Sequence, residues 1–424
     1  MPPLAPRFAC AAPFTLCPLA LSLSAGHHRA MTKVEPINAE TPAYRDPPPF
    51  HLTAQDHCLG FYPAGKDRLK ALLALIDGAQ GTLRMCFYIF AEDEVSRQVR
   101  DALIAAARRG VRVTLILDGF GATASEQFLE PLNAVGGQTA RFSAHWSQRY
   151  LIRNHQKIVV ADERLAMIGG FNIEDDYFSP PAMNGWNDLA VTVEGKAVAD
   201  LVRWYDRLLE WTSQRRPRWS AIRRIVRQWD AGKGPVRLLV GGPTKGLSSW
   251  ARCVSEDLIA GDRLDMMMAY FSPPKRLQRR IARIAEKGDT RLVMAGKSDN
   301  NATIGATRAL YRYLLKRDAR IWEFGACKLH TKLIVLDDAV YVGSANFDMR
   351  SLYLNLELML RIEDAALADR MRDFVSQHLP ASEAITPALH KQRSTLWNRL
   401  RWRLSWFLVA VMDYTVTRRL NLGL

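Results

Sequence analysis

A motif of the form His-x-Lys-x-x-x-x-Asp occurs twice in this chain and constrains its fold more than any other feature. The first copy spans residues 155–162 and the second spans residues 330–337. Each is followed, after nearly the same number of residues, by a glycine-containing turn that ends in asparagine, Gly-Gly-Phe-Asn at 169–172 and Gly-Ser-Ala-Asn at 343–346. One copy alone could arise by chance, but two copies with matching turns indicate an internal duplication.

The predicted elements around the two motifs repeat in the same order. In the first half, residues 83–90 form an apolar run typical of a buried strand, residues 94–109 place apolar side chains at helical spacing, and residues 111–117 are rich in β-branched residues. The second half has an apolar run at 264–271 and a strand at 291–295, with an amphipathic helix between them. Each half therefore predicts a β-α-β unit with a parallel strand pair, followed by its motif strand.

The side chains of the two motifs suit the chemistry of a phosphodiester. Lysines and amides can hold the non-bridging oxygens and stabilise charge in the transition state. One neutral imidazole can attack phosphorus, while a protonated imidazole donates to the leaving alcohol. The predicted catalytic and phosphate-binding residues are His155, Lys157, Asp162 and Asn172 in the first repeat, and His330, Lys332, Asp337 and Asn346 in the second.

Aligning the halves on their turn asparagines reveals a further pair of matching acidic residues. Asp188 and Glu357 each begin a short apolar alternation, and each is followed six positions later by a glutamate. A strand in which side chains alternate between faces could aim such a carboxylate back at the motif residues. We therefore predict that Asp188 and Glu357 orient the motif histidines by bonding to one ring nitrogen.

The sequence does not favour a metal site or another cofactor. In the motif, an ammonium group stands where a second metal ligand would be needed, and only His145 lies near either motif. The six cysteines lack the C-x-x-C spacing of metal ligands, and a chain of 424 residues does not depend on a disulfide framework. We expect no cofactor, and mostly buried thiols in a reducing compartment.

The charge of the chain favours a polyanionic partner. The net charge is +15, which suits either nucleic acid or an anionic bilayer. Two basic segments with interleaved tryptophans, at 215–229 and 391–412, are typical of helices that lie in the lipid headgroup layer. Because no apolar run reaches roughly 18 residues, we expect membrane contact to be peripheral. Tryptophan and arginine can also clamp single-stranded nucleic acid, so that alternative stays open.

These observations predict an organisation in five parts. A Pro- and Ala-rich start resembles a weak signal peptide, and we interpret it as an unstructured or spurious leader. The predicted parts are a leader at 1–45, a first domain at 46–210, a basic Trp-rich linker at 211–235, a second domain at 236–378 and a membrane-associating tail at 379–424.

The doubled motif and its turns resemble the phospholipase D superfamily over most of residues 55–375. Within it, the chain is similar to the shorter bacterial cardiolipin synthases that lack N-terminal spanning helices. Supporting stretches lie at 117–121, 270–273, 296–299 and 343–351. The resemblance implies two duplicated α/β/α sandwich domains with one active site at their interface, no metal, and a phosphohistidine intermediate. It also implies His155 as the nucleophile and His330 as the acid.

We therefore expect a cardiolipin synthase, which moves a phosphatidyl group from a donor phospholipid to phosphatidylglycerol. The donor stays open between phosphatidylglycerol and phosphatidylethanolamine, as does the oligomeric state. The expected partners are these lipids and an anionic membrane surface, on the cytoplasmic side of the inner membrane, without nucleic acid. The alternative is a phosphodiesterase that hydrolyses nucleic acid or phospholipid. A catalytically silent scaffold is disfavoured because neither copy lacks a motif residue.

Overall fold

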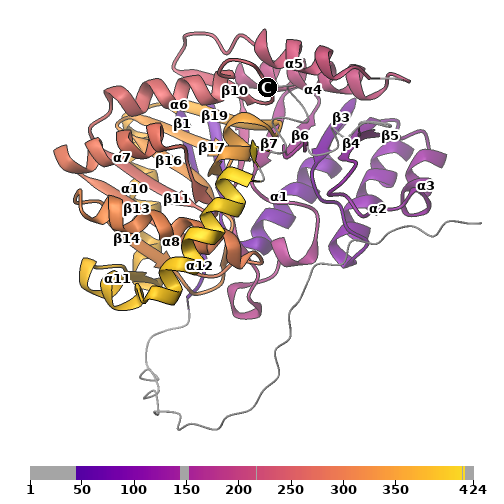
Figure 1. Ribbon diagram of the computed structural model, residues 1–424. Coiled ribbons are helices and arrows are strands. Elements are labelled where there is room, and N and C mark those ends of the chain that lie inside the picture. Colours follow the sequence, from indigo (N-terminus) through magenta and orange to yellow (C-terminus); the bar gives the residue numbers. More distant parts are fainter. Residues whose placement is uncertain (1–43, 144–151, 216, 413, 416–424) are drawn as a thin grey trace, which may run out of the picture. The chain divides into compact units, whose positions relative to one another are not determined.

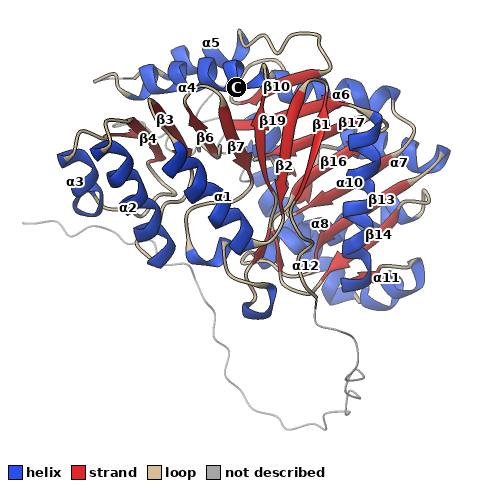
Figure 2. Cartoon of the chain, turned by 180° about the vertical axis from the view of Figure 1, so that it is seen from behind, coloured by secondary structure: helices blue, strands red, loops and turns tan. Residues whose placement is uncertain are grey.

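The computed structural model describes residues 44–143, 152–215, 217–412 and 414–415. The predicted leader therefore lies almost entirely outside the described residues. The described part forms an α/β fold with two eight-stranded sheets, one from each half of the chain (Figure 1). Helices cover both sheets, as Figure 2 shows.

The first sheet has the strand order β1-β2-β9-β7-β6-β3-β4-β5. Its strands are β1 (Phe50–Ala54), β2 (His57–Tyr62), β3 (Thr82–Phe87), β4 (Arg112–Asp118), β5 (Gln138–Phe142), β6 (Ile158–Ala161), β7 (Leu165–Gly169) and β9 (Ala190–Glu194). Its helices are α1 (Gly65–Gly78), α2 (Glu94–Arg108), α3 (Glu126–Ala134) and α4 (Ala197–Thr212). Strand β3 pairs in parallel with β4, as the β-α-β pattern predicts.

The second sheet has the order β10-β19-β17-β16-β11-β13-β14-β20. Its strands are β10 (Val236–Gly241), β11 (Leu264–Met268), β13 (Thr290–Ala295), β14 (Arg320–Phe324), β16 (Lys332–Leu336), β17 (Ala339–Gly343), β19 (Glu357–Glu363) and β20 (Ser382–Ala384). Its main helices are α6 (Ser249–Ala260), α7 (Lys275–Lys287), α8 (Asn301–Leu315) and α10 (Ala365–His378). Strand β20 lies beyond the predicted limit of the second domain at residue 378.

Apart from β1 and β20, the two sheets have the same order. The series β2-β9-β7-β6-β3-β4-β5 corresponds strand by strand to β10-β19-β17-β16-β11-β13-β14. In both, the motif strand pairs antiparallel with the first strand of the β-α-β unit, β6 with β3 and β16 with β11. The predicted duplication of an α/β unit is therefore confirmed.

The two sheets share one hydrophobic core. It contains residues of both sheets together with Trp204 of α4, Ile222 of α5 (Trp219–Arg227) and Phe374 of α10, all fully buried. Helices α1 to α3 cover the other face of the first sheet, and α6 to α8 cover the other face of the second. Burial of apolar surface on both faces of each sheet explains why the central strands read as continuous apolar runs.

The tryptophans of the basic segment between the halves belong to this core. Trp219 packs on Trp211 with ring centroids 5.3 Å apart, and Trp229 packs on Trp204 at 5.6 Å. The indole nitrogen of Trp229 donates to the carbonyl of Leu238 at 2.8 Å. The prediction that these tryptophans contact a membrane is wrong, because α5 is amphipathic and turns its indole face inward while Arg224 and Arg227 stay exposed.

The segment that follows the second repeat is helical, and it packs against that repeat. Helix α11 (Pro387–Arg393) leads into α12 (Leu396–Trp406), which packs against α8. Trp402 is buried and stacks on His390 with centroids 5.5 Å apart. Among the described residues, no helix combines the length and the apolar character needed to cross a bilayer.

Replacing a core tryptophan of the linker should therefore destabilise the fold. We expect Trp219→Ala to lower the free energy of unfolding by about 3–5 kcal/mol, because a large buried ring leaves a cavity. Denaturant unfolding measures this. Trp397→Ala is the control, since Trp397 is 71% exposed, and its unfolding should stay within about 0.5 kcal/mol of the parent protein. Equal stability of Trp219→Ala and the parent would contradict the burial of α5.

Candidate active site

The two motif histidines lie directly before the central strands β6 and β16. His155 precedes β6 by three residues, and His330 precedes β16 by two. Both histidines therefore occupy the segments that lead into these strands. Each motif lysine bends back, so that Nζ of Lys157 donates to the carbonyl of His155 at 2.6 Å and Nζ of Lys332 donates to that of His330 at 2.5 Å.

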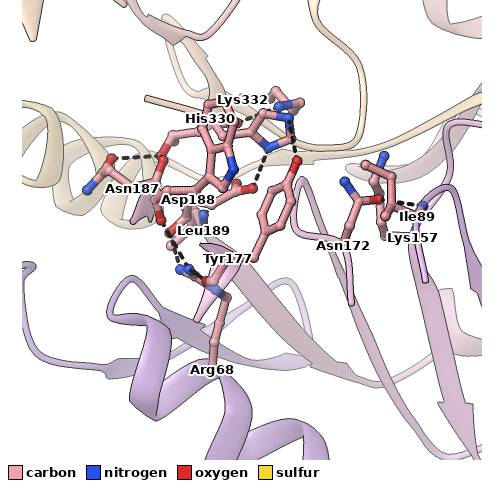
Figure 3. Close-up of polar contacts among 12 residues, drawn as sticks. Arg68, Ile89, Lys157, Asn172, Tyr177, Asn187, Asp188, Leu189, His330 and Lys332 are labelled. Atoms are coloured by element: carbon pink, nitrogen blue, oxygen red, sulfur yellow. Dashed lines mark hydrogen bonds and ion pairs between the residues drawn. The ribbon is translucent and has the colours of Figure 1, made fainter. Parts of the chain in front are cut away.

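The carboxylates that hold the histidines are exchanged between the repeats. Nδ1 of His330 lies 2.6 Å from Oδ2 of Asp188, and Nδ1 of His155 lies 3.1 Å from Oε2 of Glu357. Figure 3 shows the Asp188–His330 bond. Each histidine therefore depends on the other half of the chain. Because a carboxylate accepts the Nδ1 proton, Nε2 carries the lone pair that can face a substrate.

Backbone bonds reinforce this exchange. The amide of His330 donates to the carbonyl of Asn187 at 2.7 Å, and the amide of His155 donates to that of Leu356 at 2.9 Å. Each acceptor is the residue directly before the orienting carboxylate. Beside the His330–Asn187 bond, the two halves also form a short parallel strand pair, β8 (Trp186–Asn187) with β15 (Lys328–Leu329). The halves are thus joined at the site itself.

The glycine-containing turns make room for the orienting carboxylates. A Cβ atom on Gly170 would lie only 2.6 Å from Oδ1 of Asp188, so a larger residue would displace the carboxylate. In the second repeat the matching residue is Ser344, whose hydroxyl donates to Oε2 of Glu357 at 2.5 Å. The position that must be glycine beside Asp188 thus carries a hydrogen-bonding hydroxyl beside Glu357.

The two turn asparagines are buried beside the site. Oδ1 of Asn172 accepts from the amide of Ile89 at 3.1 Å (Figure 3). Asn346 is 4% exposed, and its Oδ1 has no hydrogen-bond partner among the described residues. Both positions suit contact with a bound phosphate, and that role stays a prediction.

Burial sets the ionisation of the site. It lowers the pKa of Lys157 to about 7 and that of Lys332 to about 8. Burial likewise lowers the pKa of His155, and it lowers that of His330 to about 3. The lysine of each repeat also lowers the pKa of the opposite histidine by charge repulsion, which indicates that the four groups lie in one site.

The motif aspartates lie at the other end of the motif strands. Asp162 accepts hydrogen bonds from the amides of Gln80, Gly81 and Thr82 at 2.7–2.9 Å. Asp337 accepts from the amide of Arg263 at 2.9 Å. The structure does not bring these residues to the histidines, because a strand separates the two ends of each motif. Their predicted catalytic role is corrected to holding the turn that follows the strand against the start of its neighbour.

Sequence reasoning missed several residues that surround His330. Tyr177 and Trp186 contact its ring, with centroids 5.0 and 5.1 Å away. Arg68 is fully buried and reaches the same place from α1. None of them belongs to a repeated motif, and they come from the half of the chain opposite to His330, so no spacing rule could have found them.

Comparison with known proteins identifies the family. The family model described as cardiolipin synthase, PLD-like domain, matches residues 72–210 and 258–379. The chain belongs to this family. This confirms the resemblance that the doubled motif indicated.

Individual relatives agree with this assignment. The chain is 30% identical over 332 residues to cardiolipin synthase 1 of Bacillus cereus, covering 73% of this chain and 64% of that relative. It is 29% identical over 343 residues to cardiolipin synthase B of Escherichia coli, covering 79% of this chain and 83% of the relative. A crystal structure of phosphatidylserine synthase from Haemophilus influenzae superimposes with a TM-score of 0.68 at 16% identity, covering 88% and 97% of the two chains, and shows that the fold is shared.

Among the described residues, no three His, Cys, Asp or Glu side chains group in a way that could hold a metal ion. The described cysteines, Cys58, Cys86, Cys253 and Cys327, are free thiols. Cys10 and Cys17 lie outside the described residues. The expectation of metal-free, cofactor-free chemistry stays a prediction.

The lowered lysine pKa values predict an alkaline limit on activity. As pH rises through about 7 to 8, Lys157 and Lys332 of the free enzyme lose the protons that attract a phosphodiester, so kcat/KM should fall. The dependence of kcat should begin at higher pH, because a bound anion raises the lysine pKa. A pH series of initial rates measures both.

Lys157→Arg is the matched variant, since guanidinium stays charged throughout this range. Its kcat/KM should persist to higher pH, whatever its maximum. A parent profile that stays flat up to the ordinary lysine pKa would contradict the predicted ionisation.

Proposed function

We propose that this protein is a cardiolipin synthase, a phosphatidyltransferase that uses both motif histidines in one active site. The observation that carries the proposal is the exchanged pair of His–carboxylate bonds, Asp188 with His330 and Glu357 with His155, in a chain of the cardiolipin synthase family. Two imidazoles whose Nδ1 atoms are held by carboxylates, beside two buried lysines, can supply a nucleophile, an acid and charge stabilisation.

The first half-reaction forms a phosphohistidine. Nε2 of His155 attacks the phosphorus of the donor phospholipid, and the bond from phosphorus to the alcohol oxygen breaks. His330 gives its Nε2 proton to the leaving alcohol. The phosphatidyl group stays on His155. We assign the nucleophile to His155 because it is the more accessible ring, with 13% of its side chain exposed against 5% for His330.

The second half-reaction reverses these roles. A glycerol hydroxyl of phosphatidylglycerol gives its proton to Nε2 of His330 and attacks phosphorus, and the bond to His155 breaks. Lys157, Lys332, Asn172 and Asn346 would hold the non-bridging oxygens throughout. Asp188 and Glu357 keep each ring in the required tautomer.

Substrate binding favours the protonated form of His330, which acts as the acid. In the free protein, burial keeps His330 neutral, with a pKa lowered to about 3. A phosphodiester anion between the two lysines would offset their charge and stabilise an imidazolium, so protonation of His330 would accompany binding. This coupling favours proton donation only when a substrate is present.

A membrane-facing helix is the second part of the proposal. Helix α12 exposes a stripe of apolar side chains while Trp402 anchors its other face. The stripe consists of Leu396 (84% exposed), Trp397 (71%), Leu400 (59%) and Leu404 (55%), and it continues to Phe407 (48%) directly after the helix. Exposed Arg399, Arg401 and Arg403 are interspersed along the same helix. An apolar stripe among arginines suits the headgroup layer of an anionic bilayer. We place the protein on the cytoplasmic side of the inner membrane.

The function is tested by incubating the purified protein with phosphatidylglycerol vesicles and identifying the lipids by mass spectrometry. We expect cardiolipin and glycerol from the parent protein. His155→Ala should abolish turnover, and His330→Ala should lower it by about 10²–10⁴-fold, as expected for loss of a general acid. Adding phosphatidylethanolamine tests the second donor.

Two results would contradict this function. The first is cutting of single-stranded DNA without cardiolipin formation, which would favour the nuclease alternative. The second is phosphatidic acid as the main product, which would favour a lipid hydrolase. Substantial activity in either histidine variant would contradict a shared two-histidine site.

The membrane contact is tested by replacing three exposed residues of α12. We expect Leu396→Gln, Trp397→Gln and Leu400→Gln together to weaken co-sedimentation with anionic vesicles, because they remove most of the exposed apolar stripe. Thermal unfolding should stay unchanged. Met183→Gln with Ile259→Gln is the matched control, since these apolar residues are 72% and 61% exposed but lie outside α12. Equal binding of the two variants would exclude α12 as the contact.

A further inference from the structure

The two histidines have unequal surroundings. The ring of His330 has Tyr177 at 5.0 Å and Trp186 at 5.1 Å, and these two rings stack on each other at 5.6 Å. All three side chains are buried. His155 has the ring of Tyr88 at 5.0 Å and is more exposed. A duplication that made two equal motifs has therefore placed them in different environments.

The hydroxyl of Tyr177 faces the reactive nitrogen of His330. Its oxygen lies 3.4 Å from Nε2, while Nδ1 on the opposite side of the ring bonds to Asp188 (Figure 3). This contact is long for a hydrogen bond, as contacts in unliganded sites often are. Burial raises the pKa of Tyr177, so the hydroxyl keeps its proton. By rotating, it can donate to neutral Nε2 or accept from a protonated Nε2.

One buried arginine fixes the residues around His330. The guanidinium of Arg68 donates to the carbonyls of Tyr177 at 2.5 Å, Asp188 at 2.6 Å and Trp186 at 3.3 Å. These are the residues whose side chains contact Nε2, Nδ1 and the face of the ring. In the second repeat, the matching position four residues after the helix cap is Arg252, which is exposed and bonds to the carbonyl of Leu247. The first repeat therefore supplies the buried arginine that fixes these residues, and the matching arginine of the second repeat has no such role.

We propose that Tyr177 is a positioning residue that holds Nε2 of His330 for proton transfer and keeps it from attacking phosphorus. This rests on the two-histidine function proposed above. A lone pair that accepts a hydrogen bond from a fixed hydroxyl is unavailable as a nucleophile. Proton transfer needs only a rotation of that hydroxyl. When His330 gives its proton to the leaving alcohol, the hydroxyl turns to donate to the freed lone pair, and it turns back when the acceptor alcohol returns a proton.

The first test observes the hydrogen bond without any substrate. In histidine-labelled protein, the ¹⁵N resonance of Nε2 of His330, assigned by its absence in His330→Asn, should shift in Tyr177→Phe. Tyr205→Phe is the control, because Tyr205 is also buried and loses a structural hydroxyl bonded to the carbonyl of Met85 at 3.0 Å. An unmoved resonance in Tyr177→Phe overturns the proposal. If Tyr177→Phe does not fold, 3-fluorotyrosine in the parent protein, a stronger donor, should move the same resonance.

The second test compares leaving groups. Phosphatidylglycerol releases an alcohol that needs a proton, whereas phosphatidyl-p-nitrophenol releases a stable anion. We expect Tyr177→Phe to lower turnover of phosphatidylglycerol by about 10- to 100-fold, the loss typical of a residue that orients a reactive group. Turnover of the p-nitrophenyl lipid should fall much less. Equal losses on both substrates would indicate a merely structural role and overturn the proposal.

Measurements on the parent protein distinguish a failure of this proposal from a failure of the proposed function. If it forms no cardiolipin, the synthase function fails, and the resonance of His330 still decides the role of Tyr177. Quenching with detergent at mildly alkaline pH, where phosphohistidine is stable, followed by peptide mapping should find the phosphoryl group on His155 in the parent protein. A phosphoryl group on His330 would overturn the proposal, because Tyr177 would then not prevent attack.

Discussion

The exchange of carboxylates between the repeats is the interaction on which the rest of this site depends. Each motif supplies an imidazole and an ammonium group, but the group that fixes the imidazole comes from the other half. Asp188 and Glu357 are fully buried, and a buried charge without a partner is strongly unfavourable. Neither half could bury its own carboxylate and histidine in this way alone. The site and the contact between the halves therefore form together.

The shared core makes this exchange possible. Helices α4 and α10 and the linker helix α5 fill the space between the two sheets with large apolar side chains. This core holds β6 and β16 in fixed relation, so that the segments before them can present their histidines to one place. The buried lysines add to the cost of the site, since burial lowers the pKa of both. Hydrophobic burial elsewhere offsets that cost, and a bound phosphate would relieve it.

Much of this arrangement could be predicted from the sequence because the motif and the order of elements around it occur twice in the chain. The repeated order of elements gave both β-α-β units, and alignment of the halves gave Asp188 and Glu357. The exchange itself could not be predicted, since either carboxylate could have served its own histidine. The role of Asp162 could not be predicted, because the motif alone does not show which backbone amides its carboxylate faces. Trp219 was misplaced because composition does not say which way a short amphipathic helix turns its indoles. Arg68 and Tyr177 have no repeated counterpart, so only the folded chain reveals them.

The proposed membrane contact and the site are linked through a single helix. Helix α12 packs on α8, and α8 begins directly after the loop that contains Asp299. Asp299 accepts a hydrogen bond from the hydroxyl of Tyr270 at 2.8 Å and helps to raise the pKa of Lys332 against the effect of burial. A helix that lies in the headgroup layer would therefore bring the edge of the site near the lipid phosphates. Because one face of α12 is held by Trp402, its exposed stripe has a fixed direction relative to α8, and a bilayer that bound this stripe would also orient the site.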